Sequence, residues 1–228
     1  MRVYGKNVVK EILHNKKTIR KAYIYENFKD EEILKELKNE KVPCKFLDKR
    51  GLDNIEEGNH QGIIIEIDDY NYCPLDKLLS REIIVILDHL EDPHNFGAII
   101  RTCEAAGINS IIIPKDRTVK VNATVMKTSA GTLENVDICM VTNLVNTIKI
   151  LKDNNFWIIG TDMEGTNYRK LDYKGKIAIV IGNEGKGLSR LVEDNCDFIA
   201  KIPMRGKVNS LNASVAAALV IYEAVINR

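Results

Sequence analysis

The sequence predicts an α/β protein of two domains, in which a small α/β domain precedes a larger one built on a doubly wound parallel sheet. Short apolar runs alternate with amphipathic stretches along the chain, which is typical of βα units. The 228 residues, 45% of them hydrophobic, suffice for one large core or two small ones. An aperiodic stretch containing a proline interrupts the pattern after residue 67. We therefore expect a first domain over residues 1–70, a linker over 71–80 and a second domain over 81–228.

The first domain is expected to contain two helices and three strands. Amphipathic spacing predicts a helix over residues 6–13, and a charged stretch predicts another over 30–40. Short apolar or β-branched runs predict strands over residues 22–25, 42–46 and 62–67. These elements are enough to form a small, separate α/β unit.

The second domain continues the alternation with longer and more apolar runs, which are typical of parallel strands covered on both faces. The expected strands cover residues 83–87, 110–114, 156–160 and 177–182, and the expected helices cover 95–106, 142–154 and 210–226. Ligands bind beyond the carboxyl ends of the strands in open parallel sheets. The loops that follow these runs are therefore the places where we expect a site.

Charge and hydropathy exclude several classes of protein. The 33 Lys and Arg residues against 32 Asp and Glu give a net charge of +1, so contact with nucleic acid must come from local basic patches. No apolar run approaches the roughly 20 residues that span a bilayer. The N-terminus lacks the apolar core of a secretory signal. We expect a cytoplasmic protein without membrane contact.

The five cysteines are widely spread, without a C-x-x-C pair or a histidine at zinc-ligand spacing. We therefore expect reduced thiols in or near the cores and no metal site.

Three loops after apolar runs carry clusters of polar residues or glycines. In the first, residues 87–102, Asn95 opens the expected helix and Arg101 lies about two turns further along. An N-cap asparagine and a solvated arginine explain these two residues equally well when each is judged alone.

The second loop, residues 179–189, has three glycines around Glu184. It is not a Walker A loop, because Lys186 precedes the last glycine and no hydroxyl follows at the required place. It is not a dinucleotide fingerprint either, since the glycines occur in the order G-x-x-G-x-G. Glycines let backbone approach a ligand closely, so we expect a binding loop with one carboxylate beside it.

The third loop precedes the last expected helix and is rich in small polar residues. Helix capping alone explains Asn209, Ser210 or Asn212 when each is taken singly. Arg205 and Lys207 add positive charge to the same loop. Together these residues indicate an anionic or polynucleotide partner.

In this order and spacing, the three blocks resemble the motifs of the SpoU (TrmH) family of RNA ribose 2′-O-methyltransferases, within the knotted SPOUT class. The matching blocks are N-x-G-x-x-x-R from Asn95, GNEGKG from Gly182 and IPMRGKVNSLNASVA from Ile202. The first domain, with NHQGI at residues 59–63, is similar to the substrate-binding domain of the RlmB branch. That branch methylates a guanosine ribose in large-subunit (23S) ribosomal RNA.

The resemblance implies features that periodicity does not reveal. It implies a deep trefoil knot formed by the chain from about residue 177 onward, although protein chains rarely knot. It implies S-adenosylmethionine as cofactor, RNA as substrate, and a homodimer with the cofactor sites near the interface. The apolar helix face over residues 215–225 is expected to contribute to that interface, although core packing explains it equally well.

The resemblance also implies a set of site residues and no metal. The cofactor-binding positions are Thr161, Gly182, Ile202 and Leu211. The positions used for catalysis and RNA binding are Asn95, Arg101, Glu184, Ser210 and Asn212.

The 2′ hydroxyl is a weak nucleophile, so the site must help to remove its proton and align the reacting atoms. In the family, the motif arginine is proposed as the base. Because a guanidinium with a pKa above about 12 almost never deprotonates in proteins, we favour Arg101 as a phosphate clamp and alkoxide stabiliser. Glu184 is expected to pair with Arg101 or to hold its loop. Asn95 and Asn212 are expected to orient these charged groups.

Two other functions stay open at this point. One is the same methylation on transfer RNA, and the other is a non-catalytic RNA-binding or ribosome-assembly protein of the same fold. A basic cluster in the first domain is either an RNA backbone contact or a solvated helix end, with equal weight. It consists of Lys16, Lys17, Arg20 and Lys21.

Overall fold

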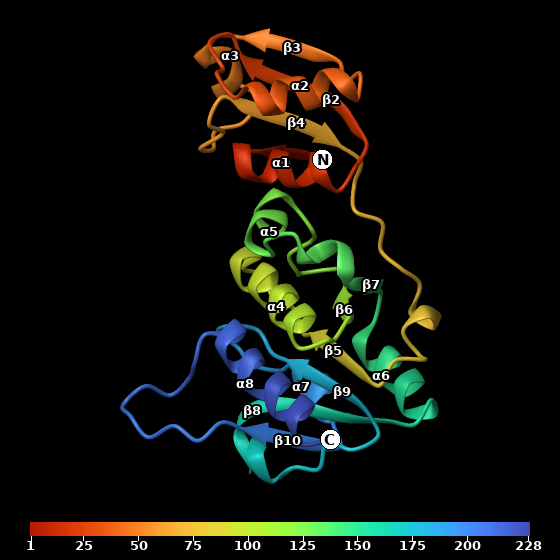
Figure 1. Cartoon of the computed structure of the whole chain (residues 1–228). Helices are drawn as coiled ribbons and strands as arrows, with labels where there is room; N and C mark the ends of the chain where they lie inside the picture. Colours follow the sequence, from red (N-terminus) through yellow and green to blue (C-terminus); the bar gives the residue numbers. More distant parts are fainter. The chain divides into compact units, whose positions relative to one another are not determined.

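The computed structural model describes all 228 residues, which form two compact units (Figure 1). Unit 1 contains Met1–Asn71 together with the segment Val121–Lys127. Unit 2 contains Tyr72–Lys120 and Thr128–Arg228. The expected α/β class is confirmed, and none of the helices has both the length and the hydropathy needed to cross a bilayer.

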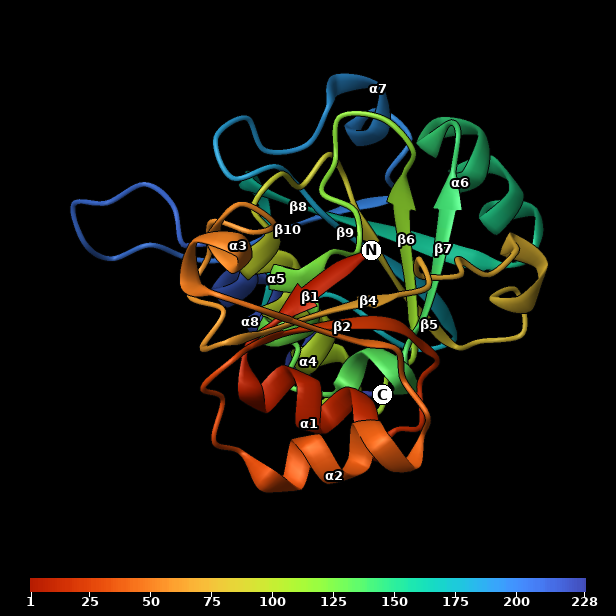
Figure 2. The same cartoon turned by 90° about the horizontal axis from the view of Figure 1, so that it is seen from above.

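Unit 1 is built on a four-stranded sheet in the order β1-β4-β2-β3. Only the pair β2 and β3 is parallel. Helices α1 and α2 lie side by side on one face of the sheet (Figure 2). The elements are β1 (Arg2–Tyr4), α1 (Lys6–His14), β2 (Ile19–Tyr25), α2 (Glu31–Asn39), β3 (Cys44–Leu47), α3 (Lys49–Asp53) and β4 (Ile63–Ile67).

Unit 2 is built on a six-stranded sheet in the order β10-β8-β9-β5-β6-β7, with every neighbouring pair parallel. The strands are β5 (Ile83–Leu87), β6 (Ser110–Pro114), β7 (Asp137–Val141), β8 (Phe156–Asn167), β9 (Lys176–Ile181) and β10 (Phe198–Lys201). The α-helices of unit 2 are α4 (Pro93–Ala105), α6 (Leu144–Asp153), α7 (Arg190–Glu193) and α8 (Ala213–Ile226), while α5 (Ala123–Thr128) belongs almost entirely to the segment assigned to unit 1. The carboxyl ends of β5, β6 and β9 therefore share one edge.

The two helices that carry sequence motifs begin at other residues than predicted. Helix α4 begins at Pro93, because Asp92 caps it by accepting a hydrogen bond from the His94 N–H at 2.8 Å. Asn95 is therefore inside the helix and is not its cap. Helix α8 begins at Ala213 rather than at residue 210, because the Asn212 side chain accepts from the first free N–H groups.

All five cysteines are free thiols, as expected. Burial raises the pKa of Cys139 to about 12 and that of Cys196 to about 12, so both stay protonated at neutral pH. Cys44 differs from the expectation because its strand, β3, lies at the edge of the sheet and leaves the thiol exposed.

Candidate functional site

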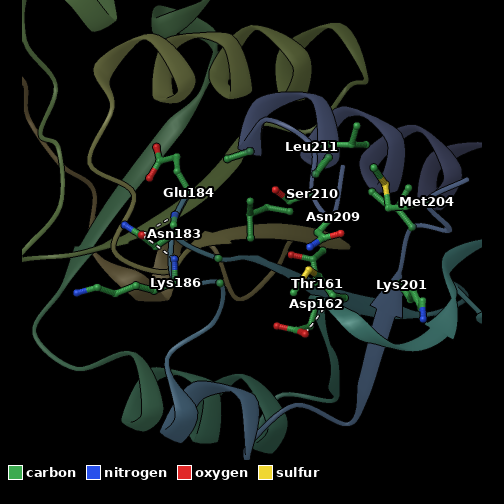
Figure 3. A pocket seen from close by; sticks show the side chains of 18 of the residues that line it. Thr161, Asp162, Asn183, Glu184, Lys186, Lys201, Met204, Asn209, Ser210 and Leu211 are labelled. Carbon is green, nitrogen blue, oxygen red and sulfur yellow. Dashed lines mark hydrogen bonds between the residues drawn. The ribbon is translucent and has the colours of Figure 1, made fainter. Parts of the chain in front are cut away.

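A pocket of about 620 Å³ opens in unit 2 beside the middle of β8 and the carboxyl ends of β9 and β10 (Figure 3). This volume lies in the range of small-molecule sites. All four residues predicted to bind a cofactor line it, namely Thr161, Gly182, Ile202 and Leu211. Glu184 and Ser210 line it too, whereas Asn95, Arg101 and Asn212 do not.

The glycine-rich loop, residues 182–189, forms one wall of the pocket and requires glycine at two positions. A Cβ atom on Gly182 would lie 2.4 Å from the carbonyl carbon of Gly187, closer than any side chain tolerates. Gly187 has a φ of +68°, in the left-handed region that favours glycine. The backbones of Asn183 and Gly187 exchange hydrogen bonds of 2.9 and 3.0 Å, which closes the loop into a tight turn.

Asn183 organises this loop and was not among the predicted site residues. Its Oδ1 accepts hydrogen bonds from the N–H groups of Gly185 and Lys186, at 3.0 and 3.2 Å. Its Nδ2 donates to the carbonyl oxygen of His89 at 2.8 Å. The signal available in the sequence was an asparagine between a strand and glycines, the usual setting of an Asx turn.

A chain of amide and carboxylate groups joins the three sequence blocks beside the pocket. Asn95, only 5% exposed, donates from Nδ2 to Oε1 of Glu184 at 3.1 Å. The same Glu184 oxygen accepts from the Asp92 N–H at 3.3 Å. Asn95 Oδ1 in turn accepts from Asn212 Nδ2 at 2.8 Å. Asn212 therefore caps α8 and also contacts the first block, so capping alone does not describe it.

Arg101 is exposed on α4, outside the pocket, and its side chain forms no ion pair or hydrogen bond. The expected pairing of Arg101 with Glu184 is therefore wrong for this structure. Glu184 instead binds Asn95 and the backbone at the start of α4, which agrees with the alternative that it holds its loop. Arg101 is left available to an external anion.

The strand that faces the glycine-rich loop adds a second carboxylate. Thr161 lies near the middle of β8 and donates from Oγ1 to the Val180 carbonyl oxygen at 3.0 Å. Asp162, which follows it, accepts from the N–H groups of Met163 and Glu164 through Oδ1. Asp162, Lys186 and Lys201 give the pocket charges of both signs together with Glu184. Sequence reasoning missed Asp162, since no motif marks it.

The loop before α8, residues 203–211, forms the opposite wall and projects from the sheet (Figure 1). All of its residues except Met204 and Leu211 are exposed, including the predicted site residue Ser210. No hydrogen bond, from backbone or side chain, connects residues 203–211 to the rest of the chain. Figure 3 shows Ser210 and Asn209 between the labelled residues Glu184 and Met204.

No cluster of three or more His, Cys, Asp or Glu side chains suited to a metal ion occurs in the structure. The pocket is lined by backbone amides, by side chains that carry hydroxyl or amide groups, by a few charges of mixed sign and by apolar side chains. Such groups fix the orientation of a polar organic ligand.

Two family models match the chain. The model described as the SpoU rRNA Methylase family matches residues 82–222. The model described as RNA 2′-O ribose methyltransferase substrate binding matches residues 2–73. The first covers more than half of the chain and includes every residue predicted for the site.

Known proteins are similar over almost the whole length. A protein of Staphylococcus aureus (strain COL) assigned to the TrmH family of tRNA/rRNA methyltransferases is 45% identical over an alignment of 232 positions. The alignment covers 97% of this chain and 94% of that protein. The SpoU methyltransferase AviRb of Streptomyces viridochromogenes, solved with AdoMet, has a TM-score of 0.79 at 22% identity and covers 99% and 89% of the two chains. The AdoMet-bound rRNA methyltransferase of Sinorhizobium meliloti has a TM-score of 0.80 at 24% identity and covers 98% and 85%. At these identities the two structures establish a shared fold.

Proposed function

The chain belongs to the SpoU rRNA methylase family, and from this premise we propose that it transfers a methyl group from S-adenosylmethionine to the ribose 2′ oxygen of a guanosine in 23S ribosomal RNA. The observation that carries the proposal is the hydrogen-bonded chain from Glu184 through Asn95 to Asn212, beside a pocket of suitable size. A protein that had lost the activity would not need to keep these three blocks in contact. Their contact therefore argues against the non-catalytic alternative. We place the activity in the cytoplasm, where the RNA substrate is found.

The pocket fits S-adenosylmethionine in size and in chemistry. The glycines at 182 and 187 leave backbone exposed for close contact, and the apolar side chains of Ile202, Met204 and Leu211 suit an adenine ring. Asp162 supplies negative charge for a cationic ligand. When bound, this cofactor supplies a methyl group already activated by a sulfonium. Thr161, Gly182, Ile202 and Leu211 are the residues we propose to hold it.

The remaining site residues are proposed to act on RNA and on one another. Glu184 fixes the glycine-rich loop against α4 through Asn95, while Asn212 holds Asn95 from the other side. Ser210, which is exposed on the unanchored wall, is proposed to contact the ribose. Positioning and electrostatic stabilisation then supply most of the catalysis.

Arg101 is proposed to clamp an RNA phosphate and stabilise the developing alkoxide, because a guanidinium keeps its proton. With Arg101→Lys, we expect a higher KM for RNA, a kcat reduced less than about tenfold, and an unchanged pH dependence of kcat. A large loss of kcat, together with a shift of the alkaline limb of the plot of kcat against pH, would identify the guanidinium as the base instead.

Residues 1–70 are proposed as the RNA-binding domain, joined through residues 71–80 to the catalytic domain over 81–228. The match of residues 2–73 to a substrate-binding model supports this. In the basic cluster, Arg20 forms an ion pair with Asp68, and the Lys21 ammonium lies 5.0 Å from the Tyr23 ring centroid. Lys17 has an interaction of its own, so Lys16 is the most available charge of the four. Neutralising all four cations is expected to flatten the salt dependence of RNA binding.

The deciding experiment is methyl transfer from labelled S-adenosylmethionine to unmodified ribosomal and transfer RNA, with modified nucleosides identified by mass spectrometry. We expect 2′-O-methylguanosine in large-subunit RNA. Label only in transfer RNA would keep the chemistry and change the substrate, an alternative that the name of the Staphylococcus aureus relative leaves open. If no RNA is labelled and the cofactor does not bind, the result would favour a non-catalytic RNA-binding or ribosome-assembly protein.

A homodimer is proposed through α8, which exposes a stripe of large apolar side chains at helical spacing. The stripe consists of Val215, Leu219, Tyr222 and Ile226. Ala217 and Val220, which lie within the predicted range of residues 215–225, are buried in the chain's own core. We expect light scattering to give twice the chain mass, and Leu219→Glu with Tyr222→Glu to give the monomer.

The deep C-terminal trefoil knot remains part of the proposal. It is supported by the order of the strands, because β8 lies between β9 and β10 in the sheet although β9 and β10 are consecutive in the chain. Pulling single molecules from the two termini tests it, because a knotted chain yields a shorter unfolded contour length than 228 free residues. A full-length extension would contradict the knot.

A further inference from the structure

We propose that Asp88, together with His89, is a positioning residue that holds the glycine-rich loop in its cofactor-binding form. The proposal rests on the proposed function, because it concerns the same pocket. Neither residue lines the pocket, and both precede the block that begins at Asn95 and were not among the predicted site residues. Both follow β5 directly, at the edge of the sheet where β9 also ends.

Asp88 is a carboxylate that is 1% exposed, so it needs polar partners to remain charged. Its Oδ2 accepts a hydrogen bond from the Ser189 N–H at 2.6 Å, and its Oδ1 contacts His89 Nδ1. Hydrogen bonds to an ionised acceptor are stronger than neutral ones. Because one of its partners is the last residue of the glycine-rich loop, the buried charge is satisfied only when that end of the loop is in place.

His89 holds the other end of the same loop. Its carbonyl oxygen accepts from Asn183 Nδ2 at 2.8 Å, while its ring contacts Asp88. The residue has a φ of +57°, a left-handed conformation that is costly for a non-glycine residue. In this conformation the His89 ring reaches Asp88 while the His89 carbonyl oxygen reaches Asn183. An ionised Asp88 requires the proton on Nδ1, which fixes the tautomer of the ring.

These contacts fix both ends of the pocket wall. Asn183 carries the hydrogen bonds that shape residues 185 and 186, and Ser189 ends the loop beside α7. Loss of the Asp88 charge should therefore displace pocket-lining backbone without removing a single pocket-lining atom. A residue that acts in this way changes the affinity for the cofactor more than the affinity for RNA.

The test is Asp88→Asn in the full-length chain, which preserves size but removes the charge. We expect the Kd and the KM for S-adenosylmethionine to rise about tenfold or more, while the KM for RNA stays within twofold of wild type. Amide hydrogen exchange should accelerate at residues 183–189 and not elsewhere in unit 2. Exchange needs no activity, so this readout survives even if the reaction proposed above is wrong.

The matched control is Asp197→Asn. Asp197 also accepts from a backbone N–H, that of Ile158 at 2.8 Å, and pairs with one cation, Lys152. It precedes β10, at the amino edge of the sheet and away from the pocket. We expect this variant to lower the melting temperature while cofactor affinity and exchange in the glycine-rich loop stay unchanged.

A second pair of variants covers the case in which Asp88→Asn does not fold. Asparagine tolerates a positive φ and valine does not, so His89→Asn should keep cofactor affinity within about threefold and His89→Val should lose it. Equal behaviour of Asp88→Asn and Asp197→Asn, or of the two His89 variants, would overturn the proposal. Wild-type protein that neither binds cofactor nor methylates RNA would instead overturn the proposed function, and loop exchange would still decide the role of Asp88.

Discussion

The two walls of the pocket differ in how the folded chain holds them. The glycine-rich loop is closed by its own backbone, shaped by Asn183 and tied to the β5 loop at both ends. The loop over residues 203–211 has no hydrogen bond at all and is mostly exposed. Both walls nevertheless carry residues predicted from the same family motifs, Gly182 and Glu184 on one and Ser210 and Leu211 on the other.

This difference divides the work of binding between the walls. A loop that is already fixed contributes affinity without an ordering cost. A loop without anchors costs roughly 1–2 kcal/mol of backbone entropy for each residue that a ligand orders. We therefore expect the glycine-rich loop to set the basal affinity for cofactor, and residues 203–211 to respond to ligands.

The largest effect is expected from matched glycine substitutions. Gly182→Ala forces a Cβ against the Gly187 backbone at 2.4 Å, and should lower the free energy of unfolding by about 3 kcal/mol and abolish cofactor binding. Gly206→Ala meets no atom within 4 Å and should change stability by less than about 0.5 kcal/mol. Urea titration and calorimetric binding measure both. Equal losses in the two loops would break the comparison.

A smaller effect is expected from matched asparagine substitutions. Asn183→Ala removes three hydrogen bonds, each worth about 1 kcal/mol, and should raise the Kd for cofactor ten- to a hundredfold. Asn209→Ala removes none and should leave the free energy of unfolding unchanged. A destabilised Asn209→Ala variant would show that the 203–211 loop is anchored after all.

Limited proteolysis should show the same contrast without mutation. Trypsin is expected to cut after Arg205 or Lys207 in the unanchored loop. S-adenosylmethionine should slow this cleavage severalfold, the factor expected if the bound cofactor stabilises the ordered loop by roughly 1 kcal/mol. Lys186, which is also exposed, should resist in both states because its backbone is hydrogen-bonded. Cleavage after Lys186 in the free protein would contradict a preformed wall.

The smallest effect concerns charge. Arg205→Gln with Lys207→Gln should reduce the slope of log K against log salt for RNA by about 1.4, near 0.7 for each lost contact with a single strand. The melting temperature should not change, since neither side chain has a partner. An unchanged slope would show that RNA does not reach this loop. The control is the double variant Lys149→Gln with Lys174→Gln, which removes two exposed cations away from the pocket.

Much of this could be predicted from the sequence, because the relevant signals are local. Runs of apolar residues predicted β5, β6 and β9 at or near their observed bounds, and they predicted the start of β8, although β8 continues to Asn167, seven residues beyond its predicted end. The three motif blocks predicted the family, which the comparisons confirm, and the second and third of them supply residues that line the pocket. Strands β1, β7 and β10 were missed, because they are three to five residues long and lack a distinctive pattern. The knot, the dimer and the roles of the site residues stay predictions.

The sequence by itself determined the class of fold, the family and six of the residues that line the pocket, because neighbouring side chains and their spacing carry that information. Only the tertiary structure decided which groups meet. Asn183 and His89 are 94 residues apart, Asp88 and Ser189 are 101 apart, and Asn95 and Asn212 are 117 apart. Their contacts depend on the order of strands in the sheet, which places β9 beside β5, and no local pattern encodes that order.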